Sequence, residues 1–208
     1  MVGSNLLKPS NELLANFDYK DLIRGNAYVT YYAGSAFNSG ATESPVLFVE
    51  TFRSKEETND VSLAASLSNA VRIDEDYDIE VAQTQIMKGK ALVECKITTS
   101  AVGASSGITA YLKAILRKYD GTTETDIGYA LSGSTTQSGD GTTTKEYTLV
   151  IDIPNAVRVN AGETLRFTMQ LWASTAGGVG SRGAGYYTDP TDTSNHLKVD
   201  IPFKVLNL

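Results

Sequence analysis

The stretch LKVDIPFKV, residues 197–205, alternates apolar and polar side chains over nine positions without a break. The apolar side chains that share one face of an extended chain are Leu197, Val199, Ile201, Phe203 and Val205. Alternation with period two is typical of a half-buried β-strand, so we predict a strand here. Pro202 has no backbone N–H to donate, which places this strand at a sheet edge or Pro202 at a position that does not pair.

The same alternation recurs through the second half of the chain, at residues 108–117, 146–153 and 165–173. The inward face that it predicts consists of Ile108, Ala110, Leu112, Ala114, Leu116, Tyr147, Leu149, Ile151, Ile153, Leu165, Phe167, Met169 and Leu171. Asp120-Gly121 is a strong hairpin signal and predicts a turn after the first stretch. Asn160-Ala161-Gly162 predicts another turn before the third.

The first half of the chain also favours strands, because Tyr, Val and Thr fit a pleated, half-buried surface. We predict strands at residues 27–33 and 46–54. Residues 76–87 and 91–100 predict two more strands, joined by a hairpin at Lys88-Gly89-Lys90.

The remaining stretches predict less regular structure. Residues 61–71 mix helical spacing with Ser and Val, which predicts a loop with one short helix. Ser, Thr and Gly dominate residues 133–144 and 174–185, which predicts two exposed loops. Residues 1–26 show no core of their own and predict an arm, with one or two helical turns at residues 11–17.

About eight or nine strands separated by turn signals favour an all-β fold. We predict a two-sheet antiparallel sandwich, jelly-roll-like, formed by a single domain at residues 27–208 with a short N-terminal arm at residues 1–26. We expect the arm to dock on a neighbouring protein through the apolar side chains of Leu6, Leu7, Leu13, Leu14 and Phe17. The alternative is an arm that frays in solution.

Charge and cysteine content exclude several kinds of partner. The chain has 18 Lys and Arg against 24 Asp and Glu, a net charge of −6, and no basic run. Because nucleic-acid binding needs clustered basic side chains, we expect no nucleic-acid partner. We also expect no membrane association, since no apolar stretch approaches about 20 residues and the first residues lack the core of a secretion signal.

Cys95, the single cysteine, excludes an intrachain disulfide and is expected to be a buried, inert thiol in a reducing cytoplasm.

Patterns that support catalysis or metal binding are weak. His196 is the only histidine and there is no Gly-x-Ser-x-Gly turn, which argues against a Ser-His-Asp hydrolase; one His and one Cys are too few for a zinc site. The acidic residues near 74–78 and 189–192 lack the ligand order of a calcium loop, and the Gly-rich residues 177–185 lack the ending of a phosphate-binding loop. We therefore expect no enzyme, no cofactor and no metal, although a carboxylate pair for glycoside hydrolysis stays open.

Aromatic side chains give a second hypothesis, because their faces stack on sugar rings in lectin-like sandwiches. The candidates for such a platform are Tyr31, Tyr32, Trp172, Tyr186 and Tyr187. Tyrosine is equally common on ordinary strand faces and at protein interfaces, so these remain open as alternatives.

Five stretches of the chain together form a familiar pattern. They are GNAYVTYYAG (25–34), TAYLKAILRKYDGTTETDIGYALSG (109–133), YTLVIDIP (147–154), AGETLRFTMQLWA (161–173) and LKVDIPFKVLNL (197–208). They resemble a group of structural proteins from tailed archaeal viruses and related environmental phages. The resemblance covers most of the chain from Gly25 to Leu208 and is weakest over residues 55–90. Such proteins often have His-Asp-Pro before the last loop, whereas this chain has Tyr187-Thr188-Asp189-Pro190, so no role for a histidine carries over.

The resemblance implies a virion component with a jelly-roll fold: a capsid decoration (cement), minor capsid or turret protein. We expect it to bind the major capsid protein or other virion proteins by surface burial, within a virion assembled in the host cytoplasm. We also expect a homo-oligomer, for which a trimer is the first candidate and a pentamer the second. The alternative is a tail or baseplate module for host attachment or carbohydrate binding.

Overall fold

The computed structural model describes residues 15–16, 26–37, 43–49, 58–103, 107–189 and 195–204, and all of its regular structure is β. The all-β prediction is therefore confirmed. The strands are β1 (Ala15–Asn16), β2 (Asn26–Phe37), β3 (Glu43–Phe48), β4 (Thr58–Leu63), β5 (Ala70–Glu80), β6 (Gln85–Val102), β7 (Gly107–Tyr119), β8 (Glu124–Leu131), β9 (Thr135–Ser138), β10 (Gly141–Val159), β11 (Thr164–Thr175), β12 (Ser181–Tyr187) and β13 (Lys198–Lys204). Within the described residues, no helix is long or apolar enough to cross a membrane.

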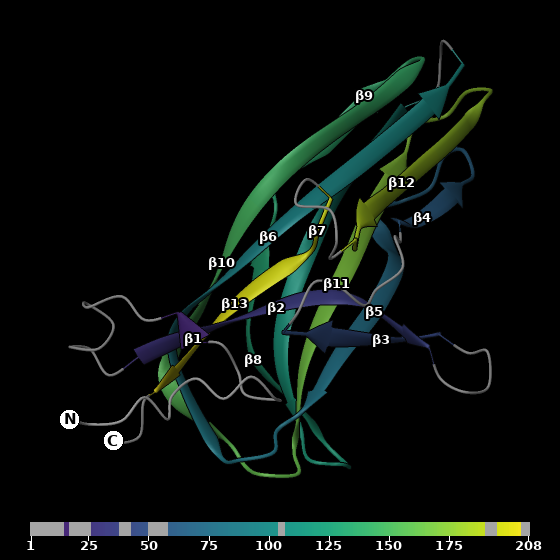
Figure 1. Cartoon of the computed structure of the whole chain (residues 1–208). Helices are drawn as coiled ribbons and strands as arrows, with labels where there is room; N and C mark the ends of the chain where they lie inside the picture. Colours follow the sequence, from purple (N-terminus) through teal and green to yellow (C-terminus); the bar gives the residue numbers. More distant parts are fainter. Residues whose placement is uncertain are drawn as a thin grey trace, which may run out of the picture.

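The strands form two layers that face each other across a common core (Figure 1). In the first layer, β6 pairs with β10 along one edge, while its other edge pairs with β12 and then with β13. β12 continues to β4, and β13 continues to β2. In the second layer, β7 lies between β11 and the consecutive strands β8 and β9, and β11 continues to β5.

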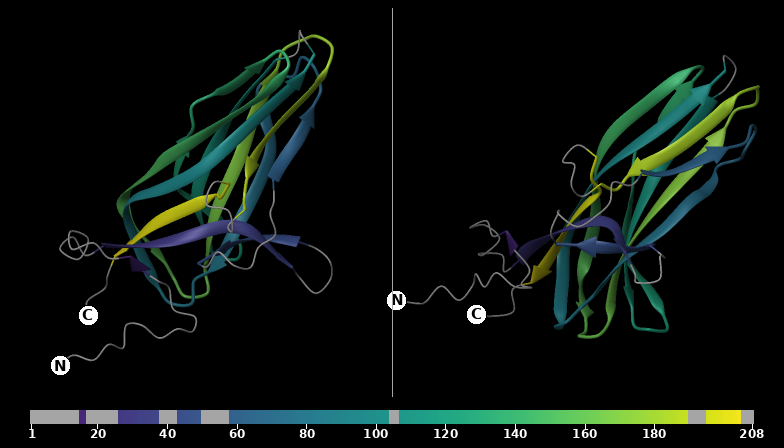
Figure 2. Two further views of the ribbon diagram at one scale, coloured as in Figure 1. Left: turned by 45° about the horizontal axis from the view of Figure 1, so that its top comes forward. Right: turned by 45° about the vertical axis from the view of Figure 1, so that its right-hand side comes forward.

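The two layers are also joined through β2 and β3. β2 pairs with β3, and β3 pairs with β5 by a parallel bridge between Val46 and Asp78. The hydrogen-bonded path therefore runs from one layer into the other, and the sandwich is one mixed 13-stranded sheet folded over its core. Figure 2 shows β2 and β3 crossing the lower half of the sandwich at a steep angle to the long strands.

The core confirms the face predicted from the period-two alternation. Buried side chains from both layers form one apolar cluster, which includes Leu112 and Leu116 of β7, Ile151 of β10 and Phe167 of β11. Each such side chain contributes roughly 1.5–3 kcal/mol through its removal from water. Of the predicted inward residues, only Tyr147 is half-buried rather than buried.

β13 lies in the interior of its layer, between β2 and β6, so the edge position offered for it is wrong. Pro202 lies opposite Tyr28 of β2, but the pairing of β13 with β6 is interrupted between Asp200 and Phe203, so the second alternative holds on the β6 side only. Pro202 thus falls where an N–H is not needed on that side of the strand.

β6 runs unbroken from Gln85 to Val102, so the hairpin predicted at Lys88-Gly89-Lys90 is wrong. Gly89 has a φ of +127° and pairs with Ile153 of β10, next to the register shift between Ile153 and Val157. Only glycine adopts this φ readily, and here it lets the strand continue through a bulge instead of turning back.

Three other predicted irregular stretches differ from the structure. Residues 61–71 contain the end of β4 and the start of β5 but no helix. Residues 133–144 contain β9 and the start of β10, and residues 174–185 contain the end of β11 and the start of β12. In residues 133–144 the composition was misleading because threonine, although polar, fits the pleated surface of a strand. Thr135 of β9 is fully buried.

The predicted arm is described only at Ala15, Asn16 and Asn26. Ala15 and Asn16 form β1 and pair with Val29 and Tyr28 of β2, which begins at Asn26. The helical turns predicted for residues 11–17 are wrong at these two positions. The proposed docking residues lie outside the described part of the chain: Leu6, Leu7, Leu13, Leu14 and Phe17.

Candidate binding face

The outer side of the second layer carries most of the exposed aromatic chemistry of the described chain. Strand register builds it, because residues of one parity on β7 and β11 point away from the core. Tyr111 pairs with Trp172, and Lys113 pairs with Gln170. β8 adds Tyr129 and Leu131 on the other edge of β7. We call the surface made by Tyr111, Lys113, Tyr129, Leu131 and Trp172 the aromatic face.

Tyr111 and Trp172 form the centre of the aromatic face. Their ring centroids are 6.0 Å apart and their planes differ by 11°. The amide nitrogen of Asn69 donates to the Tyr111 hydroxyl at 3.3 Å. Asn69 directly precedes β5, on the far side of β11 from β7, so the Tyr111 ring extends across β11.

The indole of Trp172 is held in the same manner. Its Nε1–H donates to the side-chain oxygen of Gln170 at 3.1 Å. The Gln170 amide in turn donates to Asp74 on β5 at 3.2 Å. The polar ends of both rings are thus satisfied by neighbours, which fixes the rings in place. The rings stack on each other, and both residues are half-buried.

Tyr129 and Leu131 extend this surface toward the edge of the layer. Their side chains are 60% and 54% exposed. The Lys113 ammonium lies 5.0 Å from the centre of the Tyr129 ring, a cation–π contact. Ile115 of β7 lies opposite Tyr129 and is buried, although the strand alternation directs it away from the core.

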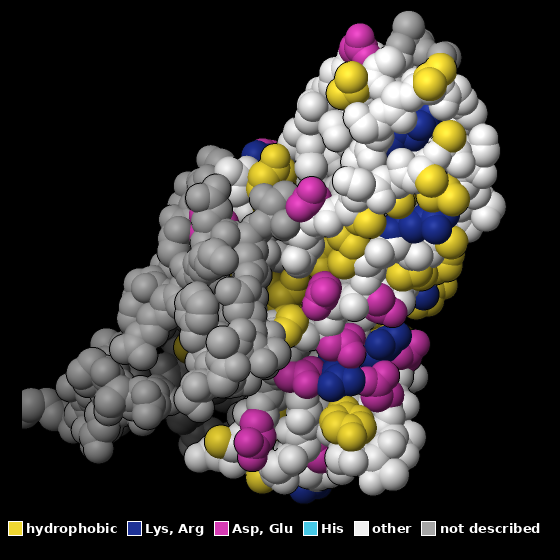
Figure 3. Space-filling view, turned by 90° about the vertical axis from the view of Figure 1, so that its right-hand side faces the viewer, with side chains coloured by type: hydrophobic (Ala, Val, Ile, Leu, Met, Phe, Trp, Pro, Cys, Tyr) yellow, Lys and Arg dark blue, Asp and Glu magenta, His cyan; other side chains and the backbone are white. Residues whose placement is uncertain are grey.

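A network of charged side chains, the charge ladder, lies lower on the same layer. Arg166 donates two hydrogen bonds to Asp78, from Nε at 2.7 Å and from Nη2 at 2.8 Å. Arg117 donates to Asp126 at 2.9 Å, and Arg166 also pairs with Glu124 and Asp76. Hydrogen bonding to Asp78 raises the pKa of Arg166 above its ordinary value. Figure 3 shows basic and acidic side chains interleaved on the lower part of one face, below a hydrophobic band.

The first layer has a polar hollow of about 260 Å³ lined by Glu94, Lys96, Glu146 and His196. Glu94 lies 3.2 Å from the Lys198 ammonium and 3.4 Å from His196 Nε2. Burial raises the pKa of Glu94, but hydrogen bonds from Lys198 and His196 outweigh it and lower the pKa overall. The Lys198 ammonium offsets the charge of Glu94, and the contact between His196 and Glu94 joins the segment before β13 to β6.

Cys95 borders the same hollow but faces inward. Burial raises the pKa of its thiol to about 12, so the thiol stays protonated near neutral pH and is a poor nucleophile. The prediction that it is buried is confirmed.

The Gly-rich residues 177–185 surround a side chain of their own. Arg182 is buried and donates to the carbonyl oxygens of Gly177, Gly178 and Gly180 at 2.9–3.2 Å. The loop carbonyls therefore hold an internal guanidinium. Among the described residues, His, Cys, Asp and Glu side chains form no group that could hold a metal ion.

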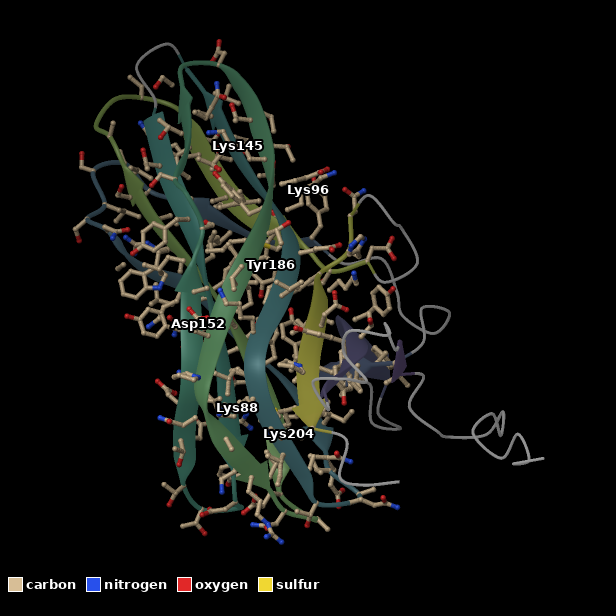
Figure 4. All side chains as sticks on the ribbon, turned by 90° about the vertical axis from the view of Figure 1, so that its left-hand side faces the viewer. Lys88, Lys96, Lys145, Asp152, Tyr186 and Lys204 are labelled. Carbon is tan, nitrogen blue, oxygen red and sulfur yellow. The ribbon has the colours of Figure 1, made fainter. Side chains whose placement is uncertain are left out.

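The structure separates the five aromatic residues predicted as a sugar platform. Tyr31 and Tyr186 belong to the core, where the Tyr186 hydroxyl lies 3.3 Å from that of Tyr77. Figure 4 shows Tyr186 among the strands at mid-height of the sandwich. Tyr32 packs edge-on against His196. Of the five, only Trp172 lies on the aromatic face.

Sequence reasoning missed Tyr111 and Tyr129, the other aromatic members of this face. The available signal was parity, because Tyr111 falls on the outward side of its predicted strand, opposite Leu112. What the sequence lacked was the register that sets Tyr111 beside Trp172.

No protein-family model matches this chain, and no curated protein matches it. Solved structures similar to it include a CocE/NonD family hydrolase from Staphylococcus aureus (11% identity, TM-score 0.38, covering 82% of this chain and 41% of that one). They also include an aminopeptidase from a marine sediment Thaumarchaeota archaeon (8% identity, TM-score 0.46, covering 84% and 37%) and Eiger TNF from S. frugiperda (10% identity, TM-score 0.30, covering 87% and 94%). The chain spans about two fifths of the length of the two enzymes. All three TM-scores lie below 0.5, so these likenesses assign neither a family nor an activity.

Proposed function

We propose that this protein is a structural component of a virus particle that binds by surface contact and has no catalytic role. The observation that carries the proposal is the location of its exposed chemistry. The aromatic face and the charge ladder both lie on the outer side of a packed sandwich. Rigid faces with aromatic and arginine side chains are typical of surfaces that bind by burial. The resemblance of five sequence stretches to virion structural proteins supports the same role.

The partner in this proposal is the major capsid protein or another virion protein. The protein itself is proposed to form a homotrimer, and a homopentamer is the second candidate. A stable contact buries about 800 Å² on each partner. We infer that residues 1–26 supply part of this area through Leu6, Leu7, Leu13, Leu14 and Phe17. The virion would be assembled in the host cytoplasm.

Deletion of residues 1–14 tests the proposal and leaves β1 in place to pair with β2. The truncated protein is expected to keep its thermal unfolding transition, because the core lies in later strands. We expect it to lose co-sedimentation with capsids that lack the native protein, whereas the full chain binds them at a fixed ratio.

Val179→Ser is a matched control, because Val179 is an exposed apolar side chain in the turn between β11 and β12. This variant is expected to bind capsids as the full chain does. If the truncated protein co-sediments with capsids at the same ratio as the full chain, residues 1–14 do not contribute to capsid binding. Failure of the full-length protein to bind capsids at all would overturn the virion role itself.

A further inference from the structure

We propose that the aromatic face binds a neutral glycan, with sugar rings stacked on Tyr111 and Trp172. This inference goes beyond a structural role, because it assigns a ligand to a specific surface. It stands on three properties of that surface: fixed rings, a polar rim and a small area flanked by charges of both signs.

The fixed rings suit a ligand with a flat apolar face. Tyr111 and Trp172 lie nearly parallel, and Asn69 and Gln170 hold their polar ends. Rings already held in position lose little conformational entropy when a ligand binds. The C–H face of a pyranose ring matches such an aromatic surface.

The polar rim suits the hydroxyl groups around a sugar ring. Asn69 is exposed and uses one N–H on Tyr111, so its amide keeps a second N–H and its carbonyl oxygen. Asp74 on β5 is also exposed. The next row of the layer adds Thr109 and Thr136, whose hydroxyls lie 3.1 Å apart. A purely apolar ligand would displace water from these polar groups and offer them no hydrogen bonds in its place.

The area of the aromatic face alone suits a small ligand, whereas the protein contact proposed above also draws on the charge ladder and on residues 1–26. Side chains of this kind have about 150–250 Å² each, and partial burial leaves roughly 400 Å² exposed over Tyr111, Trp172, Tyr129 and Leu131. A stable protein contact needs about 800 Å² on each partner. A short oligosaccharide fits within the smaller area.

Charge argues for a neutral glycan. Lys113 lies over the Tyr129 ring, Arg72 donates to the backbone oxygens of Ala173 and Ser68, and Asp74 accepts from Gln170. Charges of both signs therefore flank the rings. The charge ladder beside them is paired within the chain. An acidic or sulfated sugar would meet the Asp74 carboxylate as well as these cations, and the resulting repulsion disfavours it.

Trp172 is the only tryptophan in the chain, so its fluorescence reports on this site alone. The experiment titrates the full-length protein with cellohexaose, chitohexaose and mannohexaose. We expect at least one of them to shift or quench the emission saturably, with the same affinity at low and high salt. Tyr111→Ala is expected to weaken that binding about tenfold through loss of one stacking ring.

Two variants separate stacking from other effects. Tyr111→Phe keeps the ring and is expected to keep most of the affinity. Tyr119→Ala removes an aromatic side chain that contacts Arg166 in the charge ladder and is expected to bind normally. Calorimetry of each variant checks that its fold is intact.

Three results would overturn the inference: no saturable change with any of the three sugars, unchanged affinity in Tyr111→Ala, or binding only to sulfated oligosaccharides that disappears in high salt. The titration needs no capsid, so a negative result leaves the virion proposal to its own test.

Discussion

At the scale of single residues, the tightest contact is between two loop backbones at one end of the sandwich. Gly180 has a φ of +126°, and a Cβ placed there would lie 1.8 Å from the carbonyl oxygen of Val102. A Cβ placed on Gly103 would lie 2.5 Å from the carbonyl oxygen of Val179. The turn from β11 to β12 therefore packs directly on the end of β6, and only glycine fits at the contact.

Gly180→Ala is expected to destabilise the protein more than Gly162→Ala. Both glycines have positive φ, which costs a residue with a Cβ roughly 1–2 kcal/mol. Gly162, with a φ of +83°, has no atom within 4 Å of its added Cβ, so its variant isolates that cost. The backbone overlap at Gly180 adds about 1–3 kcal/mol more. Chemical denaturation measures both, and equal losses would show that the loops separate without cost.

Cys95 predicts how stability changes at high pH. Burial raises the thiol pKa from an ordinary 9.0 to about 12, so the folded state holds this proton more tightly than the unfolded state. The contribution is fully present below pH 9 and is lost as the pH rises from 9 to 12, at up to about 1.4 kcal/mol per pH unit. Tyr31 and Tyr186, whose pKa values burial also raises, add to the loss above pH 10.

The variant Cys95→Ala is expected to lose less stability than the original protein between pH 9 and 10, whatever its stability at pH 7. Urea denaturation at half-unit pH steps measures the two slopes. Parallel curves would show that the thiol ionises equally in both states.

At the scale of elements, the charge ladder joins β5, β11 and β8. Arg166→Lys is expected to cost about 1 kcal/mol, because an ammonium cannot reproduce the two-bond contact with Asp78. The matched control is Asp152→Asn, since the Lys90–Asp152 pair is 3.7 Å long and mostly exposed. The control should stay within about 0.5 kcal/mol. If denaturation gives the two variants equal stability, the ladder does not join the strands.

The elements predicted best were those with both alternation and turn chemistry. The turn after β7 is an example, where the amides of Thr122 and Thr123 donate to the Asp120 carboxylate. The elements missed were the Thr-rich β9 and the Gly-rich β12, whose burial depends on strands far away in sequence. β9 pairs with β7 and β12 with β6, and composition alone carries no record of such pairing.

The candidate site was predictable only in part for the same reason. Trp172 was identified from its residue type, and its outward position follows from the alternation of its strand. Tyr186 was misassigned because β12 pairs with β4 and β6, and Tyr186 lies in the core beside Tyr77. The stacking of the Tyr111 ring on the Trp172 ring could not be predicted without the register of β7 against β11.

At the scale of the whole molecule, the proposed role predicts a specific mass. Light scattering near neutral pH is expected to give about three times the 22.3 kDa of one chain, or five times for the second choice. Deletion of residues 1–14 tests whether the arm is also needed for this assembly. A monomer at all accessible concentrations would contradict the homo-oligomer.

The position of β13 also sets the order in which this fold can be completed. β2 and β6 cannot be bridged until residues 198–204 have been synthesised and have left the ribosome. Until then, both strands present open edges on the same nascent chain, a state that chaperones bind and proteases recognise. A chain that stops before residue 198 therefore cannot close its first layer.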